Sequence, residues 1–319
     1  MAEQVLADDG LAQFVARPGP AMAEIPVAEL REQAAERARA RAPGPDLDTV
    51  ADVVVAGRPA RLYRPAPDPV PLVLFLHGGG WTIGSLDTHD RVCRRLAAGS
   101  GAAVLALDYR LAPEHPWPAA VDDTVAALVE IAARPAALEP LTGAVAVAGD
   151  SAGGTLATLA CLRLRSERPA ALPDLQVLLY ANTDLTGASP SMRANGTGFG
   201  LTAEDVRTFS RNWVPDETRW ADPAVSPLHA PDLSGLPPAL VVTAEYDPLR
   251  DEGEAYARRL AEAGVEVTLR REPGLVHNFL MLDELSPASA AAADRVAADL
   301  RSRLEAAGSG RRAGPGPVS

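Results

Sequence analysis

Short apolar runs alternate with longer segments of helical periodicity along most of the chain. Apolar runs of this length, bounded by turn-forming residues, are typical of β-strands. Eight of them are predicted strands: 53–56, 60–64, 72–76, 103–107, 144–148, 175–180, 239–244 and 265–270. Apolar positions recur at helical spacing in the segments between them: 90–98, 119–133, 152–164, 251–263 and 288–306. Because most of these strands are apolar throughout and separated by helices, we expect an α/β fold with a mostly parallel eight-stranded sheet, covered on both faces after an antiparallel start.

Three segments lie outside this alternation. Residues 1–45 are predicted N-terminal helices, interrupted at Pro18–Pro20 and ended by Pro43–Pro45. The long insertion at about 182–238 holds one amphipathic stretch, 202–214, and insertions of this length are usually functional lids. Residues 46–307, with this insertion included, are the predicted catalytic domain, and the Gly-, Pro- and Arg-rich residues 308–319 are a predicted disordered tail.

Composition narrows the classes of partner. A chain of 319 residues with 47% hydrophobic residues is large enough for one sizeable α/β core. The net charge of −12 disfavours nucleic acid and anionic membrane as partners, since both attract basic surfaces. Cys93 and Cys161 are interpreted as buried thiols, because two cysteines make neither a disulfide framework nor a metal site. Because the sequence shows neither a secretory signal nor an apolar run long enough to span a bilayer, we expect a soluble, cytoplasmic protein.

The candidate chemistry begins at the segment Gly149–Gly153, which has the form G-x-S-x-G and joins a predicted strand to a predicted helix. In that setting the serine, Ser151, is held on a sharp turn with its hydroxyl exposed at the sheet edge. Upstream, three glycines follow His77 at the end of strand 72–76. Backbone N–H groups of such a loop stabilise an oxyanion. We assign the predicted donors to Gly78, Gly79 and Ala152.

A serine nucleophile needs a base and an acid that orients the base. In this topology the chain order is serine, acid, histidine, and His277 is the one histidine that follows the predicted strands after the insertion. Glu245, Asp247 and Asp251 compete as the acid; Asp247 is preferred because Asp251 is interpreted as a helix N-cap. The predicted triad is Ser151, Asp247 and His277. The other histidines are interpreted as structural: His77, His89, His115 and His229.

Several motifs in this order resemble the hormone-sensitive-lipase-like group of α/β-hydrolase carboxylesterases, mostly bacterial, over residues 70–304. The motifs are His77–Trp81, Asp108–Glu114, Gly149–Gly154, Asp247–Gly253, and His277 ahead of Phe279. The resemblance implies a cap built from the N-terminal helices and part of the insertion, a bracing role for 108–114, and catalysis without metal or cofactor. It also implies short- to medium-chain acyl ester substrates and a homodimer as a candidate assembly.

The predicted function is therefore a serine carboxylesterase working through an acyl-enzyme. An alternative is an amidase or deacetylase of an acylated small molecule, because the same triad cleaves amides. Trp81, Phe209 and Trp213 are candidate pocket residues for a larger group, although core packing explains most aromatic side chains. A non-catalytic small-molecule receptor on the same fold is a third hypothesis, disfavoured because all three triad residues are present.

Overall fold

A computed structural model describes residues 5–17 and 22–312. Its single sheet has eight strands in the order β1-β2-β4-β3-β5-β6-β7-β8. The β1–β2 and β2–β4 pairs are antiparallel, and all other pairs are parallel. The strands are β1 (Thr49–Val55), β2 (Arg58–Arg64), β3 (Val70–Leu76), β4 (Ala103–Leu107), β5 (Leu141–Asp150), β6 (Leu175–Leu179), β7 (Ala239–Tyr246) and β8 (Val267–Val276). The eight-stranded, mostly parallel sheet expected from the sequence is confirmed.

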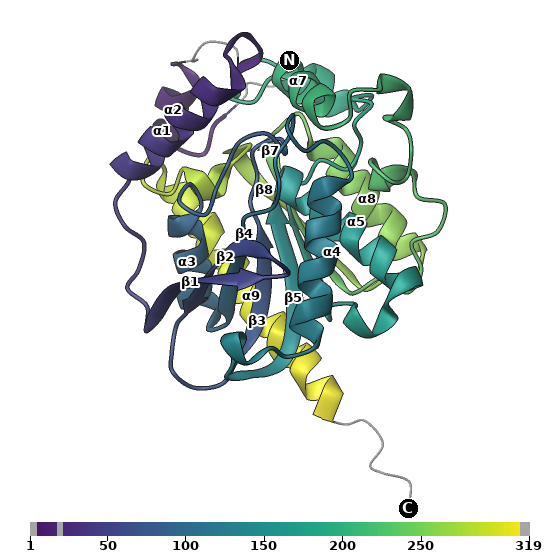
Figure 1. Cartoon of the computed structure of the whole chain (residues 1–319). Helices are drawn as coiled ribbons and strands as arrows, with labels where there is room; N and C mark the ends of the chain where they lie inside the picture. The colour runs from purple at the N-terminus through teal and green to yellow at the C-terminus, as the bar shows by residue number, and fades with distance from the viewer. Residues whose placement is uncertain (1–4, 18–21, 313–319) are drawn as a thin grey trace, which may run out of the picture.

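Helices cover both faces of the sheet (Figure 1). On one face lie α4 (Ala119–Ala132), α5 (Ala152–Glu167) and α8 (Arg250–Glu262). On the other face α3 (Asp90–Ser100) packs beside α9 (Pro287–Arg312). This two-sided cover explains why the central strands are apolar throughout rather than alternating with polar residues.

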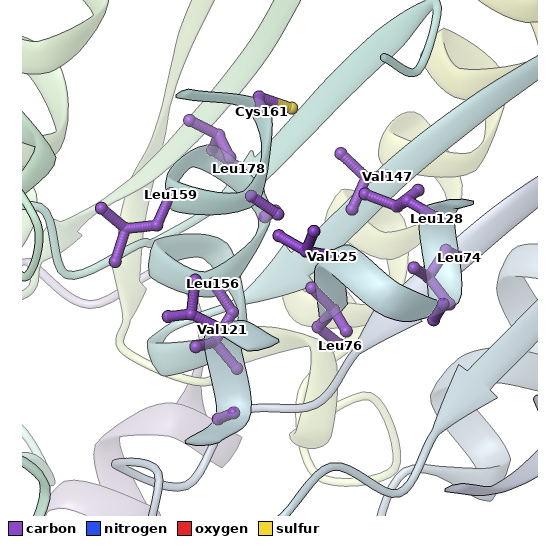
Figure 2. Packing of buried hydrophobic residues seen from close by; sticks show 14 of the residues in the cluster. Leu74, Leu76, Val121, Val125, Leu128, Val147, Leu156, Leu159, Cys161 and Leu178 are labelled. Atoms are coloured by element: carbon purple, nitrogen blue, oxygen red, sulfur yellow. The ribbon is translucent and has the colours of Figure 1, made fainter. Parts of the chain in front are cut away.

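Alternate residues of β3 enter two separate cores, as the pleat of a strand requires. Leu74 and Leu76 belong to the core beneath α4 and α5, whereas Phe75 belongs to the core beneath α3 and α9. Figure 2 shows the first core, where side chains of β3, β5 and β6 meet those of α4 and α5. All three β3 side chains are fully buried. The strand is thereby fixed in register, so the loop that follows it leaves the sheet at a defined point.

A helical cap lies at one end of the molecule. The N-terminal helices α1 (Asp9–Val15) and α2 (Val27–Ala40) lie at the same end as α7 (Ala203–Trp213) of the insertion (Figure 1). A capping box between Thr202 and Asp205 starts α7. The insertion also holds the short helix α6 (Pro190–Asn195), which the sequence analysis did not predict. The predicted break at Pro18–Pro20 lies outside the described residues.

Several element boundaries differ from the sequence-based expectation, and two of these differences change an interpretation. Helix α9 continues to Arg312, so residues 308–312 are helical rather than part of a tail, and 313–319 lie outside the described residues. Helix α8 begins at Arg250 with Leu249 at the N-cap, so the N-cap role expected for Asp251 is wrong. Cys93 and Cys161 are buried free thiols, as expected. Within the described ranges, no helix combines the length and apolar character needed to cross a bilayer.

Candidate active site

The turn from β5 into α5 presents Ser151. Its backbone has φ 53° and ψ −120°, a conformation that residues other than glycine rarely adopt. The turn is held by a hydrogen bond from Ser151 N to Leu179 O (2.8 Å) on the neighbouring strand. Gly153 permits close packing of this turn, because a Cβ there would lie 1.9 Å from Leu76 O. Sharp strand-to-helix geometry of this kind holds a nucleophile at the carboxyl edge of the sheet.

His277 and Asp247 converge on Ser151 from two other strand ends. His277 Nε2 lies 3.0 Å from Ser151 Oγ, and His277 Nδ1 lies 2.8 Å from Asp247 Oδ2. A carboxylate accepts only, so Nδ1–H donates to Asp247 and Nε2 is left to accept the serine proton. Asp247 is fully buried and His277 is 4% exposed. The structure thus brings all three predicted triad residues together in hydrogen-bonding contact.

The two rival carboxylates have other partners. Asp251 accepts from Ser191 N (2.8 Å) and from Arg250 Nε (2.8 Å). Glu245 accepts from Gly274 N (2.7 Å). Neither hydrogen-bonds to His277 among the described residues, which leaves Asp247 as its acid partner. Asp247 Oδ1 also accepts from Leu249 N (2.8 Å), so the orienting carboxylate is itself held in place.

The glycine loop after β3 lies beside this turn, but Gly78 does not fit the predicted role of oxyanion donor. Its N–H already donates to the buried Oδ1 of Asp150 (2.8 Å). In the described chain the amides of Gly79, Gly80 and Ala152 have no protein acceptor. Free N–H groups are the ones available to a developing oxyanion. Gly79 and Ala152 therefore remain candidates, and Gly80, which the sequence analysis passed over, takes the place of Gly78.

His77 braces this loop. Its ring is buried, and burial lowers the pKa of His77 to about 4, so the imidazole is neutral at pH 7. Nδ1–H donates to Gly78 O (2.8 Å). The Tyr109 hydroxyl donates to His77 O (2.7 Å), and the two rings stack with centroids 4.3 Å apart. His77 has the structural role expected of it, and the 108–114 motif contacts the loop through Tyr109.

Arg31 of α2 holds the far end of the same loop. Its Nε donates to Thr82 O (2.9 Å) and Nη2 donates to Ala112 O (2.9 Å). The guanidinium also makes a two-point contact with Glu114 at 2.8 and 2.7 Å. The sequence alone does not single out this residue, because nothing local separates Arg31 from the other arginines of its helix. It joins the N-terminal part of the cap directly to the oxyanion loop.

The predicted pocket aromatics divide into two groups. Trp81 and Trp213 stack on one another with ring centroids 4.1 Å apart, and both are buried in the same core as Leu74 and Leu76. Core packing, the alternative considered for them, therefore describes these two, and their stack ties α7 to the glycine loop. Phe209 of α7 packs directly over Gly80, where an added Cβ would lie 2.3 Å from the phenyl ring. Phe209 remains a candidate pocket residue.

The remaining histidines are away from the nucleophile. His89 is buried and faces Asp150, with Nε2 3.4 Å from Oδ1. His229 Nε2 pairs with Asp184 Oδ1 at 3.0 Å, and His115 is exposed. Over residues 5–17 and 22–312, no group of three His, Cys, Asp or Glu side chains is arranged to hold a metal ion.

Comparisons with known proteins agree with this geometry. Residues 73–281 match a family described by the α/β-hydrolase fold. The chain is 46% identical over 287 residues to the carboxylic ester hydrolase LipN of Mycobacterium tuberculosis, covering 85% of this chain and 76% of that protein. It is 40% identical over 247 residues to an ethyl acetate hydrolase of Pseudomonas putida, covering 75% and 78%. The solved structure of an esterase from Pyrobaculum calidifontis superposes with a TM-score of 0.86 at 38% identity, covering 94% of this chain and 99% of that one.

Proposed function

Because the chain belongs to the hormone-sensitive-lipase-like family of α/β hydrolases, we propose that it is a serine carboxylesterase. The observation that carries the proposal is the continuous hydrogen-bonded chain from Ser151 Oγ through His277 to Asp247. Relatives named as ester hydrolases at 40–46% identity support the same class of enzyme.

The first half-reaction forms an acyl-enzyme. Ser151 Oγ attacks the ester carbonyl carbon while His277 Nε2 takes the hydroxyl proton. Asp247 keeps the imidazole in the tautomer that accepts at Nε2 and stabilises the imidazolium that forms. The same proton then passes to the leaving alcohol as the carbon–oxygen ester bond breaks.

The tetrahedral intermediate carries its negative charge on the former carbonyl oxygen. We assign its donors to the amides of Gly79, Gly80 and Ala152, which have no protein acceptor among residues 5–17 and 22–312. Ala152 also opens α5, so the positive end of the helix dipole adds favourable potential at this point. In the second half-reaction His277 activates water, which attacks the acyl carbon and releases the acid and Ser151.

The direct test is Ser151→Ala against p-nitrophenyl esters. We expect a folded protein whose kcat falls by about 10⁶-fold, the order seen when a triad serine is removed. Ser166→Ala is the matched control, because this exposed hydroxyl donates only to Arg163 O and should leave turnover unchanged. Wild-type turnover by Ser151→Ala would overturn the proposal.

For the substrate we propose short- to medium-chain acyl esters. The ethyl acetate hydrolase among the relatives supports a short acyl group, and Phe209 over Gly80 limits the space above the oxyanion loop. A series of p-nitrophenyl esters from acetyl to dodecanoyl tests this preference, with the highest kcat/KM expected at the shorter chains.

Comparing the turnover of an anilide with that of its matching ester tests the amidase alternative. A homodimeric assembly and a cytoplasmic location remain predictions; light scattering tests the first and cell fractionation the second.

A further inference from the structure

Asp150, the last residue of β5, touches three parts of the site although it lies outside the triad. Its side chain is 1% exposed and precedes Ser151 directly in the chain. Oδ1 accepts the N–H of Gly78 (2.8 Å) from the oxyanion loop. The same oxygen lies 3.4 Å from Nε2 of His89, at the start of α3. One buried carboxylate thus links the nucleophile turn, the oxyanion loop and α3.

Gly78 and His89 leave room for the Asp150 carboxylate between them. A Cβ on Gly78 would lie 2.5 Å from Asp150 Oδ2, so only glycine lets the side chain approach. The His89 ring is oriented by Thr88, whose Oγ1 lies 2.9 Å from Ser85 O and 2.9 Å from Nδ1 of His89. That orientation turns Nε2 of His89 toward Asp150.

The buried carboxylate is stabilised in its ionised form. Burial alone would raise the pKa of Asp150, but His89 and the Gly78 N–H outweigh it, so the pKa lies below its usual value. An ionised acceptor makes a stronger hydrogen bond with a backbone N–H than a neutral acceptor does. The peptide between His77 and Gly78, immediately before Gly79, is therefore held firmly relative to Ser151.

We propose that Asp150 is a positioning residue that fixes the free amides of Gly79 and Gly80 at the distance from Ser151 that the tetrahedral intermediate requires. This inference rests on the proposed function. Asp150 acts through Gly78, and this role explains why the Gly78 N–H binds the carboxylate rather than the substrate. Because the oxyanion forms after substrate binding, loss of this contact should lower kcat and leave KM nearly unchanged.

The test compares Asp150→Ala, Asp150→Asn and Gly78→Ala with wild type. A displacement of about 1 Å in a catalytic group costs on the order of 10²-fold in rate, so we expect that loss in kcat for Asp150→Ala. Asp150→Asn keeps an oxygen that can accept from Gly78 and should recover part of the rate. Gly78→Ala keeps its own N–H but displaces the carboxylate, and should reproduce the loss.

A second readout separates positioning from general destabilisation. Affinity for a trifluoromethyl ketone, whose adduct with Ser151 carries an oxyanion, should weaken by the same factor as kcat. The control is Glu254→Ala, which removes another buried carboxylate, paired with Arg271, away from the loop. It should lower the melting temperature without changing kcat or ketone affinity.

Two results would overturn the inference: Asp150→Ala with kcat within about twofold of wild type, or unchanged ketone affinity despite lower kcat, since oxyanion stabilisation must enter both. If the alanine variant does not fold, Asp150→Asn decides on the same criteria, with a smaller loss expected. The Ser151→Ala experiment judges the proposed function separately, because it is independent of the Asp150 variants.

Discussion

The strand ends that carry the triad and the N-terminal helices of the cap are fixed by different forces. At the strand ends the contacts are short, buried and largely to backbone, as with Asp247 and Leu249 N or Asp150 and Gly78 N. The N-terminal helices are held by arginine side chains, as with Arg31 and Glu114 or Arg41 and Glu284. Buried contacts position atoms precisely. Each partly exposed ion pair, in contrast, adds little to the free energy of unfolding, and its contribution weakens with salt.

This difference predicts which substitutions should lower kcat and which should weaken the anchoring of the cap. A change at the strand ends should alter kcat with small effects elsewhere. A change in the arginine contacts should alter stability first, because these residues touch no reacting atom. Arg31 is the point where the two regions meet, since it reaches the oxyanion loop from α2.

Among the changes that compare the two regions, the largest effect on kcat is expected for Asp247→Asn. Asparagine keeps the size of the side chain but favours the wrong imidazole tautomer, which costs about 10⁴-fold in kcat in enzymes with this triad. The measurement is steady-state turnover of a p-nitrophenyl ester. Asp251→Asn is the matched control and should stay near wild type, because Asp251 binds Ser191 rather than His277. Equal losses in both variants would contradict the assignment of the acid.

Asp283→Ala should have the largest effect on stability. This carboxylate has no exposed surface and accepts from Arg41, Arg91 and Arg95 at 2.7, 2.8 and 2.7 Å, which ties the N-terminal segment to α3. Breaking a buried ion pair costs about 3–5 kcal/mol. Urea denaturation measures this loss.

The half-exposed neighbour of Asp283, Glu284, supplies the comparison: Glu284→Gln should cost less than about 1 kcal/mol. Below the unfolding transition, kcat of Asp283→Ala should remain near wild type. A loss of kcat as large as that of Asp247→Asn would mean that the cap and the strand ends are not held independently.

A smaller effect is expected for Arg31→Gln, which removes a partly exposed two-point pair. We expect a cost of about 1 kcal/mol in the free energy of unfolding, smaller at high salt. Arg39→Gln breaks the Arg39–Glu32 pair, in which both side chains are 64% exposed, and should have no measurable effect. Indistinguishable stabilities of these two variants would show that α2 is not anchored through Arg31.

The pH dependence of the same contact gives the smallest effect. The hydrogen bond from Arg31 lowers the pKa of Glu114 to about 2 from its ordinary value of 4.5. A lowered folded-state pKa contributes stability above the ordinary value, and that contribution is lost as pH falls toward the folded value. The difference in melting temperature between wild type and Glu114→Gln should therefore narrow as pH falls from about 4.5 toward about 2. A constant difference across that range would contradict the pairing.

The sequence predicts most of the fold and the triad because their signals are local. The strand β4 matches its predicted run at both ends, and the strand–turn–helix around Ser151 follows from the small residues flanking it. Asp247 and His277 could be placed from the order of predicted strands, since each follows a strand end on the same edge of the sheet.

The parts that the sequence could not settle depend on contacts between distant segments. Which amide of the glycine loop is free depends on Asp150 approaching from β5, and a run of identical glycines carries no sign of that. The burial of Trp81 depends on its stack with Trp213, far along the chain. Sequence periodicity describes one element at a time, so these pairings appear only in three dimensions.

Covalent labelling shows directly whether Ser151 is a nucleophile activated by His277. Intact-mass spectrometry after treatment with a fluorophosphonate should show one adduct per chain, mapped by peptide analysis to Ser151 and absent in Ser151→Ala. Labelling should be strongly slowed in His277→Ala. No adduct on the folded wild-type protein, or an adduct on a different residue, would contradict the role of Ser151 as the nucleophile.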